Sequence, residues 1–318
     1  MSFNYEYLKS KLEEKMLAAG AEILYCTQFS RTLVEGNRVV GVVAENIEGR
    51  FAVLADTVID CTGDSNVAAD AGCEFLLGEN GDYKECQAMT LMFLVGNIPH
   101  RYRKGLMIYK KFQRVYDKAG KKIPFTVPYL IPIPHSRFGV VQFTHMYEHN
   151  PLSAADLTRA NIEGRRQMLD VYGFLKKYDR SLRRLDLISS APVLGVRESR
   201  RIVGEHTVTV DDILNGAQFP DAVCKVAFNV DIHTKSNNGQ KCFKVKPYQI
   251  PLRALIPKGF DGLLVAGRCI SGEREAMASY RVTGNCMQMG EFAARALAKA
   301  KSEGTDIRNI KFDFSELL

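Results

Sequence analysis

The stretch 262–300 constrains the fold of this chain most, because it predicts a strand, a polar loop and a helix in direct succession. Residues 263–266 form a short apolar run, which is typical of a strand buried on both faces. Gly267 ends this run, where a residue without a Cβ permits close approach by another group. A helix is expected to begin near Thr283 or Asn285, because both are favourable N-cap residues. A helix start with arginines nearby favours the binding of negative charge.

The amino-terminal part also predicts alternating helices and strands. Apolar residues at helical spacing predict a helix over 5–19, which Gly20 ends, and a strand over 21–25 follows. Two turn signals then separate runs rich in β-branched residues, which predicts a small antiparallel meander over 32–34, 39–44 and 51–54. A further buried strand over 57–60 leads into a turn and a short helix over 66–71. This order predicts an α/β fold.

The pattern changes after residue 75, which indicates a second domain inserted into the first. Proline-punctuated extended segments, a strand over 139–144 and a long helix over 156–178 are expected there. We therefore divide the chain into one domain of residues 1–75 and 250–318 and another of residues 76–249.

Composition narrows the function classes. The chain has 318 residues, of which 46% are hydrophobic and 25% charged, as in soluble globular proteins. The net charge of +7 is spread along the chain, which argues against nucleic acid and suits an anionic ligand. The eight cysteines form no C-x-x-C pair and no signal peptide or membrane-length run is present, which predicts a cytoplasmic protein with free thiols. His145 and His149 lack a third ligand, so no metal site is expected.

The carboxy-terminal third carries a longer pattern, IP…LIP…LLVAGRCIS…RV…C…MG, at Ile250-Pro251, 255–257, 263–271, Arg281-Val282, Cys286 and Met289-Gly290. This pattern resembles the flavin-contacting segment of bacterial-type FAD-dependent oxidoreductases of the two-domain, glutathione-reductase-like superfamily. The chain departs from it at Gly272 and at 283–285, where relatives more often carry Met-Pro-Thr. The resemblance implies a Rossmann-like FAD/NAD(P)-binding domain with a β-meander and an inserted α+β substrate domain.

The resemblance also implies which residues contact the cofactor FAD. They lie in the turn after the strand at 57–60 and in the loop and helix start after the strand at 263–266: Thr62, Gly63, Asp64, Gly267, Arg268, Arg281, Val282, Thr283 and Asn285. Physically, Gly63 permits close backbone approach and donors at a helix start stabilise a reduced, anionic flavin. Taken alone, Thr62-Gly63-Asp64 fits an ordinary strand-to-helix turn equally well.

Substrate handling is expected from Arg197, Arg200 and His233, because arginine grips carboxylates and histidine exchanges protons near neutral pH. The alternative is that the segment RESRR forms structural ion pairs with Glu198 and Glu205, which is favoured for Arg201. Cys61, Cys269 and Cys286 are expected to be buried, small apolar side chains rather than redox thiols.

One motif of the superfamily does not occur in this sequence. No two glycines stand two residues apart, so G-x-G-x-x-G is absent. We therefore expect an incomplete FAD domain, in a truncated chain or in one whose nucleotide-binding half is supplied by another chain. The predicted function is that of an FAD-dependent oxidoreductase that transfers hydride between flavin and a small organic substrate. The alternative is a non-catalytic subunit or interaction protein that binds no flavin by itself; homo-oligomerisation is left open.

Overall fold

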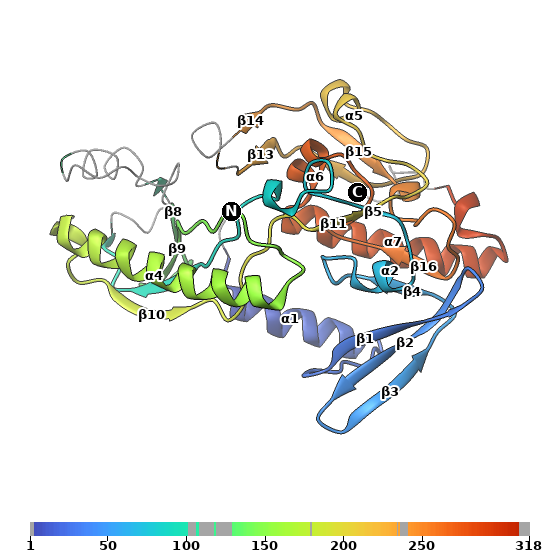
Figure 1. The fold of residues 1–318 in the computed structure, drawn as a ribbon, viewed down its shortest axis with the longest axis horizontal. Helices are drawn as coiled ribbons and strands as arrows, with labels where there is room; N and C mark the ends of the chain where they lie inside the picture. The colour runs from blue at the N-terminus through green and yellow to red at the C-terminus, as the bar shows by residue number, and fades with distance from the viewer. Residues whose placement is uncertain are drawn as a thin grey trace. The chain divides into compact units, whose positions relative to one another are not determined.

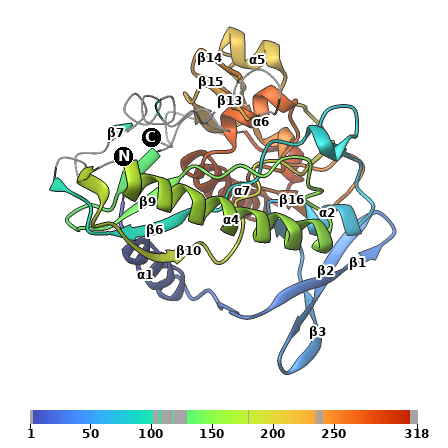
Figure 2. The ribbon, with the colours of Figure 1, turned by 60° about the vertical axis from the view of Figure 1, so that its left-hand side comes forward.

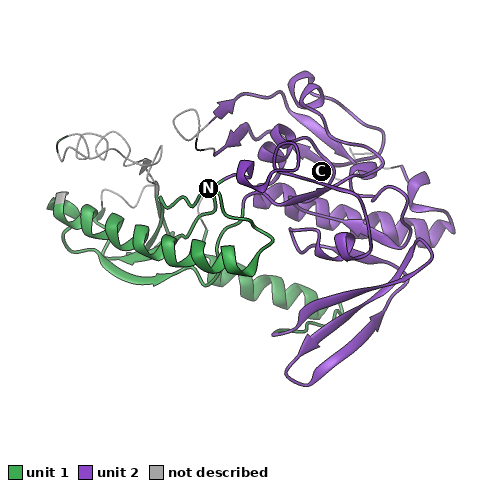
Figure 3. Cartoon of the chain, viewed as in Figure 1, with its two compact units in different colours: residues 1–25, 88–196, 235–239 green, residues 26–87, 197–234, 240–318 purple. Residues whose placement is uncertain are grey.

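The structure is a computed structural model that describes residues 3–100, 106–107, 118, 129–178, 180–233, 235 and 241–311. The chain forms two compact units, each drawn from three separate segments (Figure 3). One unit comprises residues 1–25, 88–196 and 235–239, and the other comprises residues 26–87, 197–234 and 240–318. The second unit thus contains 197–233, which the sequence-based division had placed in the inserted domain. The assignment of FAD and substrate binding to separate domains stays a prediction.

A pair of parallel strands lies at the centre of the second unit. β4 (Val58–Asp60) pairs with β16 (Leu263–Val265) in the register Val58 to Leu263 and Asp60 to Val265. All three residues of β16 are buried, which confirms the strand predicted there. Because the strands are parallel, their carboxyl ends lie at the same edge, where open α/β sheets bind their ligands.

The predicted meander is confirmed in the same unit. β1 (Gln28–Glu35), β2 (Arg38–Asn46) and β3 (Gly49–Leu54) pair antiparallel in the order β1-β2-β3 and form the long blue ribbon of Figure 1. The turn between β1 and β2 contains Gly36 at a φ of +62°, a conformation that favours glycine.

Other elements complete this unit around one apolar core. Three antiparallel strand pairs join β5 (Phe75–Leu77) to β11 (Arg200–Ile202), β12 (Ala222–Val226) to β15 (Tyr248–Pro251), and β13 (Val230–Ile232) to β14 (Lys241–Phe243). The helices are α2 (Asn66–Asp70), α5 (Val210–Asn215), α6 (Arg274–Tyr280) and α7 (Thr283–Glu303), with short 3-10 turns at Tyr83–Glu85, Leu252–Ala254 and Ile307–Asn309. Helix α7 buries one face through Met289, Phe292, Ala293, Ala296 and Ala300.

The first unit is built on an antiparallel sheet of order β10-β6-β9-β8-β7. Its strands are β6 (Phe93–Gly96), β7 (Leu106–Met107), β8 (Tyr129–Pro132), β9 (Gly139–Gln142) and β10 (Asp186–Ser190). The long helix α4 (Ala154–Tyr178) covers one face of this sheet, with a 3-10 turn at Arg180–Leu182 after it (Figures 1 and 2). Phe93, Val95 and Val141 of the sheet share a core with Val171 and Phe174 of α4. The predicted helix and the strand from residue 139 are therefore confirmed.

The amino-terminal segment of this unit corrects one prediction. Helix α1 (Tyr5–Ala18) forms as expected, and Asn4 caps it. Residues 21–25, however, form no strand, and Leu24 and Tyr25 are exposed. The apolar run lacks a neighbouring strand with which to pair, and an unpaired segment gains no ladder of hydrogen bonds.

Candidate functional site

The turn at the carboxyl end of β4 is organised by one buried carboxylate. Oδ1 of Asp60 accepts hydrogen bonds from the backbone N–H of Thr62 at 2.9 Å and from its hydroxyl at 2.7 Å. Oδ2 accepts from the N–H groups of Val67 at 2.9 Å and Ala68 at 3.0 Å. Asp60 thereby satisfies the first turn of α2, since Ser65 at the N-cap position makes no side-chain cap. The turn 62–64 is held firmly at the edge of the sheet.

Gly63 brings this turn into contact with the loop that follows β16. Its φ is +76°, and a Cβ at this position would lie 2.3 Å from Nη1 of Arg268. Nη2 of Arg268 donates to Oδ1 of Asp64 at 2.6 Å, and the hydroxyl of Ser199 donates to the same carboxylate. Close approach at Gly63 is therefore real, and the group that approaches is a guanidinium of this chain.

The space beside Gly267 is open. Its φ is +111°, and a Cβ placed on it would meet no atom within 4 Å. The glycine is required by the backbone conformation after β16 rather than by a close neighbour in this structure.

The helix predicted after this loop begins at one of the two expected residues, but its N-cap differs. α7 begins at Thr283, and Val282 occupies the N-cap position without a side-chain cap. The N-cap predictions at Thr283 and Asn285 are thus wrong, because the extended backbone of Val282 (ψ 148°) already ends the preceding segment. Thr283 and Gly284 are exposed. The positive end of a 21-residue helix is therefore left without a capping side chain.

Arg281 and His233 meet at the side chain of Gln87. Nη2 of Arg281 donates to Oε1 of Gln87 at 3.3 Å and to the backbone oxygen of Asp231 at 2.9 Å. The backbone N–H of His233 donates to the same Oε1 at 3.2 Å. Burial lowers the pKa of Arg281, while the charges of Asp231 and Glu198 act in the opposite direction. Gln87 was not predicted, because nothing in the local sequence separates it from an ordinary buried amide.

The His233 imidazole is held by the neighbouring carboxylate of Asp231. Their closest atoms, Nε2 and Oδ2, are 3.1 Å apart. Burial lowers the pKa of His233; the hydrogen bond to Asp231 raises it, and the positive charges of Arg197 and Arg281 lower it further. The imidazole is consequently neutral at neutral pH. Three of the residues expected at the site, Arg197, His233 and Arg281, are thus close enough to influence one another electrostatically.

Arg200 lies elsewhere, at the turn after β4. Its Nη1 donates to the backbone oxygen of Asp64 at 3.1 Å and to Asn66 at 3.0 Å, and its guanidinium lies over the ring of Phe75. Arg201 is a structural residue, as expected: it is buried and pairs with Glu198 at 2.7 Å. The expected role of Glu205 in this cluster is wrong, because Glu205 pairs with Arg308 instead.

A family model described as FAD dependent oxidoreductase matches residues 1–317. The chain belongs to the FAD-dependent oxidoreductase family. The resemblance seen in the sequence is confirmed, and FAD is the cofactor that the family's description names. None of the curated proteins compared matches the chain.

Solved flavoprotein structures are only distantly similar to this FAD-dependent oxidoreductase family member. The myxobacterial chondrochloren halogenase, described as a new variant of FAD-dependent halogenases, has 13% identity and a TM-score of 0.49. The match covers 95% of this chain and 53% of the halogenase chain. The geranylgeranyl bacteriochlorophyll reductase-like protein of Thermoplasma acidophilum has 11% identity and a TM-score of 0.46, with 94% and 54% covered. The L-proline dehydrogenase of P. horikoshii has 11% identity and a TM-score of 0.36, with 92% and 54% covered. The chain thus spans about half the length of these structures.

The donor groups of this FAD-dependent oxidoreductase family member fit the flavin ring of FAD. Among the described residues of the second unit, five buried side-chain nitrogens have no hydrogen-bond partner: Gln87 Nε2, Arg200 Nε, Arg268 Nε, Arg281 Nε and Asn285 Nδ2. All five are donors, and an unpaired buried donor is costly. The isoalloxazine ring carries carbonyl and ring-nitrogen acceptors that gain negative charge on reduction. A set made only of donors, beside an uncapped helix start, therefore suits this group.

The cysteines of the site segments only partly follow the expectation. Cys269 is buried, and burial raises its pKa to about 12, so its thiol is inert at neutral pH. Cys286 is half-buried, and burial raises its pKa as well. Cys61 is exposed, which corrects the expected burial, because the strand ends at Asp60 and the chain turns outward. The described parts of the chain hold no cluster of three metal-ligating side chains.

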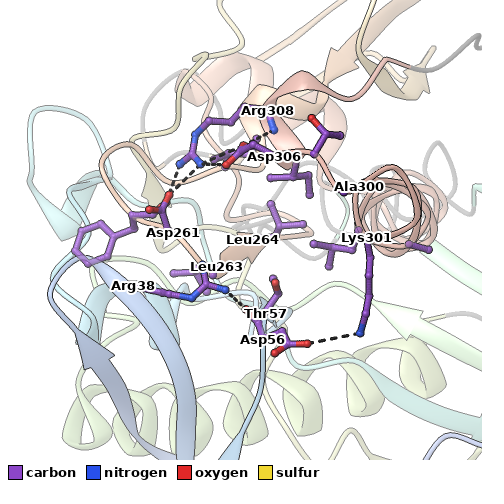
Figure 4. Close-up of a pocket in the computed structure, with 18 residues that line it drawn as sticks. Arg38, Asp56, Thr57, Asp261, Leu263, Leu264, Ala300, Lys301, Asp306 and Arg308 are labelled. Atoms are coloured by element: carbon purple, nitrogen blue, oxygen red, sulfur yellow. Dashed lines mark hydrogen bonds and ion pairs between the residues drawn. The ribbon is translucent and has the colours of Figure 1, made fainter.

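A separate cavity of about 670 Å³ lies at the opposite, amino ends of the two parallel strands (Figure 4). Leu263 and Leu264 lie in its wall, together with the carboxyl-terminal part of α7. Charged side chains at its rim are paired with one another: Arg308 lies 2.9 Å from Asp261, and Lys301 lies 3.6 Å from Asp56. No helix within the described ranges is long and apolar enough to span a membrane.

Proposed function

We propose that this chain provides the flavin-ring site of an FAD-dependent oxidoreductase that transfers hydride between FAD and a small, anionic organic substrate. The observation that carries this proposal is the set of five unpaired, buried donors in the second unit, of which Arg200 and Arg268 contact Asp64 in the turn after β4. The family match over residues 1–317 supports FAD as the ligand of these donors.

In this proposal the cofactor lies against two segments that the parallel strands bring to one edge. The turn at Thr62, Gly63 and Asp64 and the loop at Gly267 and Arg268 line one side, and the segment from Arg281 through Val282 and Thr283 to Asn285 lines the other. Bound FAD supplies the acceptor and donor of hydride. The N–H groups at the start of α7 and the guanidinium of Arg281 would stabilise negative charge on the reduced ring.

Substrate handling falls to Arg197 and His233. A buried arginine binds a carboxylate with two parallel hydrogen bonds, which would orient an anionic substrate. His233 is neutral at neutral pH and is held by Asp231, so it can take up a proton from a reacting group. Arg200, which was expected to share this role, is better suited to supporting the turn at Asp64.

We further propose that the adenosine half of FAD is held by a segment or chain that carries the nucleotide-binding motif. The absence of G-x-G-x-x-G from this sequence supports this proposal. The second candidate function, a non-catalytic subunit that binds no flavin by itself, follows from the same absence. The free state of all eight cysteines supports a cytoplasmic location.

Flavin uptake by the purified full chain tests the proposed function. When FAD is added to the chain, its fluorescence should be quenched. Its visible absorption band should shift as the flavin ring leaves water. Arg268→Gln should weaken this binding about tenfold, because it removes a charged group beside the ring. Arg295→Gln is the matched control, since Arg295 is an exposed residue of α7 that pairs with Glu291. A wild-type chain that takes up no FAD would support the non-catalytic subunit instead.

A further inference from the structure

Gln87 occupies a position to which neither the family nor the sequence assigns a role. It is the last residue of the segment 26–87 in the second unit, and only 2% of its surface is exposed. Its backbone N–H donates to Oε2 of Glu198 at 3.0 Å, and Glu198 is itself fixed by a buried ion pair with Arg201. The backbone that carries the Gln87 side chain is therefore held in place.

The orientation of the Gln87 amide is determined by its neighbours. Two donors, the backbone N–H of His233 and Nη2 of Arg281, converge on one side of the amide. Only the carbonyl oxygen can accept from both, so Oε1 must lie on this side. Nε2, which carries two N–H groups, consequently points the other way. It is buried and has no partner.

Arg281 likewise combines a nitrogen that is hydrogen-bonded with one that is not. Its Nη2 is used by Gln87 and Asp231, while its Nε is buried and has no partner. Two side chains joined by a hydrogen bond thus each keep one buried donor unpaired. Buried donors left without an acceptor destabilise a folded protein, and native structures contain few of them. Unpaired donors on two side chains that are hydrogen-bonded to each other indicate an acceptor that this chain does not itself supply.

We propose that Gln87 is a ligand-binding residue, and that its Nε2 group and Nε of Arg281 donate hydrogen bonds to oxygen or nitrogen acceptors of a bound, electron-rich ligand. A substrate carboxylate and the carbonyl edge of the isoalloxazine ring both present such acceptors. The inference rests on the proposed function, since it assigns an anchoring group within that same site. The positive charge of Arg281 favours an acceptor that carries negative charge.

Gln87→Glu is the sharpest test, because it replaces the two donors of Nε2 by an oxygen and keeps the Oε1 acceptor for His233 and Arg281. Gln249→Glu is the matched control: Gln249 is also buried, and its Oε1 also accepts from a backbone N–H, that of Phe219 at 2.8 Å. Riboflavin and succinate serve as separate probes of the full chain in titration calorimetry. Circular dichroism establishes that each variant is folded. Gln87→Met provides a neutral second variant if the buried glutamate prevents folding.

The probe that responds identifies the ligand. Riboflavin affinity that falls about tenfold or more in the Gln87 variant, but not in the Gln249 variant, assigns the acceptors to the flavin ring. The same loss for succinate alone assigns them to a substrate carboxylate. Affinities that match those of wild type or of the control, or a wild type that binds neither probe, would overturn the inference and leave a buried water as the partner of both donors.

These results are separable from the test of the proposed function. A wild type that takes up FAD while Gln87→Glu binds both probes normally retains the function and loses this inference. A wild type that takes up no FAD, but whose succinate binding depends on Gln87, loses the flavin function and retains the inference.

Discussion

Single residues at this site combine a structural contact with a ligand-facing one. Gly63 is the clearest case, since it allows the turn after β4 to lie directly under the guanidinium of Arg268. Gln87 is another, because its oxygen holds two neighbours and its nitrogen faces away from them. Substitutions at such positions should therefore affect both stability and binding.

Gly63→Ala should lower stability and flavin affinity together. Its φ of +76° costs an alanine about 1–2 kcal/mol, and the new Cβ would push Arg268 away from Asp64. Gly36→Ala shares the positive φ of +62° but has no atom within 4 Å of the added Cβ, so it should lose stability alone. Urea unfolding and FAD titration measure the two effects. Equal flavin affinity in both variants would contradict the assigned role of Arg268.

The pKa of His233 predicts an acid-dependent loss of stability. Burial lowers this pKa in the folded state, so the unfolded chain binds a proton at a higher pH than the folded one. The contribution of the neutral imidazole is complete above the ordinary histidine pKa of about 6.5 and is lost as pH falls through the lowered folded value.

Thermal unfolding between about pH 8 and pH 5 measures this contribution. His233→Gln should show a shallower fall in melting temperature than wild type, because the glutamine does not titrate. His206→Gln removes the other histidine that contacts an aspartate in this unit and serves as the control. A fall of unchanged steepness in His233→Gln would show that other groups govern the acid dependence.

At the scale of elements, the junction of β4 and α2 depends on Asp60 more than on any capping residue. One carboxylate accepts four hydrogen bonds from three residues that span the turn and the helix start. Asp60→Asn would turn an NH₂ group toward backbone N–H donors on one side of the side chain. The expected loss is about 3 kcal/mol, since buried donors lose a charged acceptor.

Denaturant unfolding of two aspartate variants checks this value. Asp306→Asn alters a capping aspartate of a short, exposed 3-10 turn and should cost about 1 kcal/mol at most. Similar losses in both variants would mean that the turn after β4 can find other acceptors for its donors.

The sequence predicted elements well where periodicity and turn residues agreed. The meander followed from its β-branched runs and glycine turns, and α4 and β16 followed from their spacing and apolar run. The segment 21–25 failed because strand formation depends on a partner that local sequence does not show. The start of α7 at Thr283 was predicted, but its N-cap was not, because the conformation of Val282 rather than a capping side chain ends the preceding segment.

Much of the candidate site lay beyond sequence reasoning for a related reason. Arg268 and the turn at Gly63 could be associated through the family pattern, and the structure places them in contact. Gln87 lies far in sequence from Arg281 and His233, and only the fold brings the three together. Arg200 was grouped with Arg197 from the sequence, and the structure shows it in contact with the turn at Asp64, because residues near one another on an extended segment point in different directions.

At the scale of the whole molecule, the missing glycine motif predicts how the chain discriminates between flavins. In the proposal that the nucleotide-binding motif lies outside this sequence, the pyrophosphate and adenosine of FAD add little to its binding by this chain. FAD and riboflavin should therefore bind the full chain with affinities within about tenfold of each other. Calorimetric titration with both compounds checks this expectation. FAD binding about a thousandfold tighter than riboflavin would show that other residues of this chain hold the nucleotide half.

The parallel pairing of β4 with β16 has a consequence for folding during synthesis on the ribosome. Val58 is synthesised roughly 200 residues before Leu263, beside which it finally lies. Closing so long a loop is slow, because the chain loses conformational entropy before the contacts between the two strands stabilise it. Until residues 263–265 have been synthesised, the nascent chain thus carries an apolar strand without its partner, and the edge formed by the two strands cannot assemble.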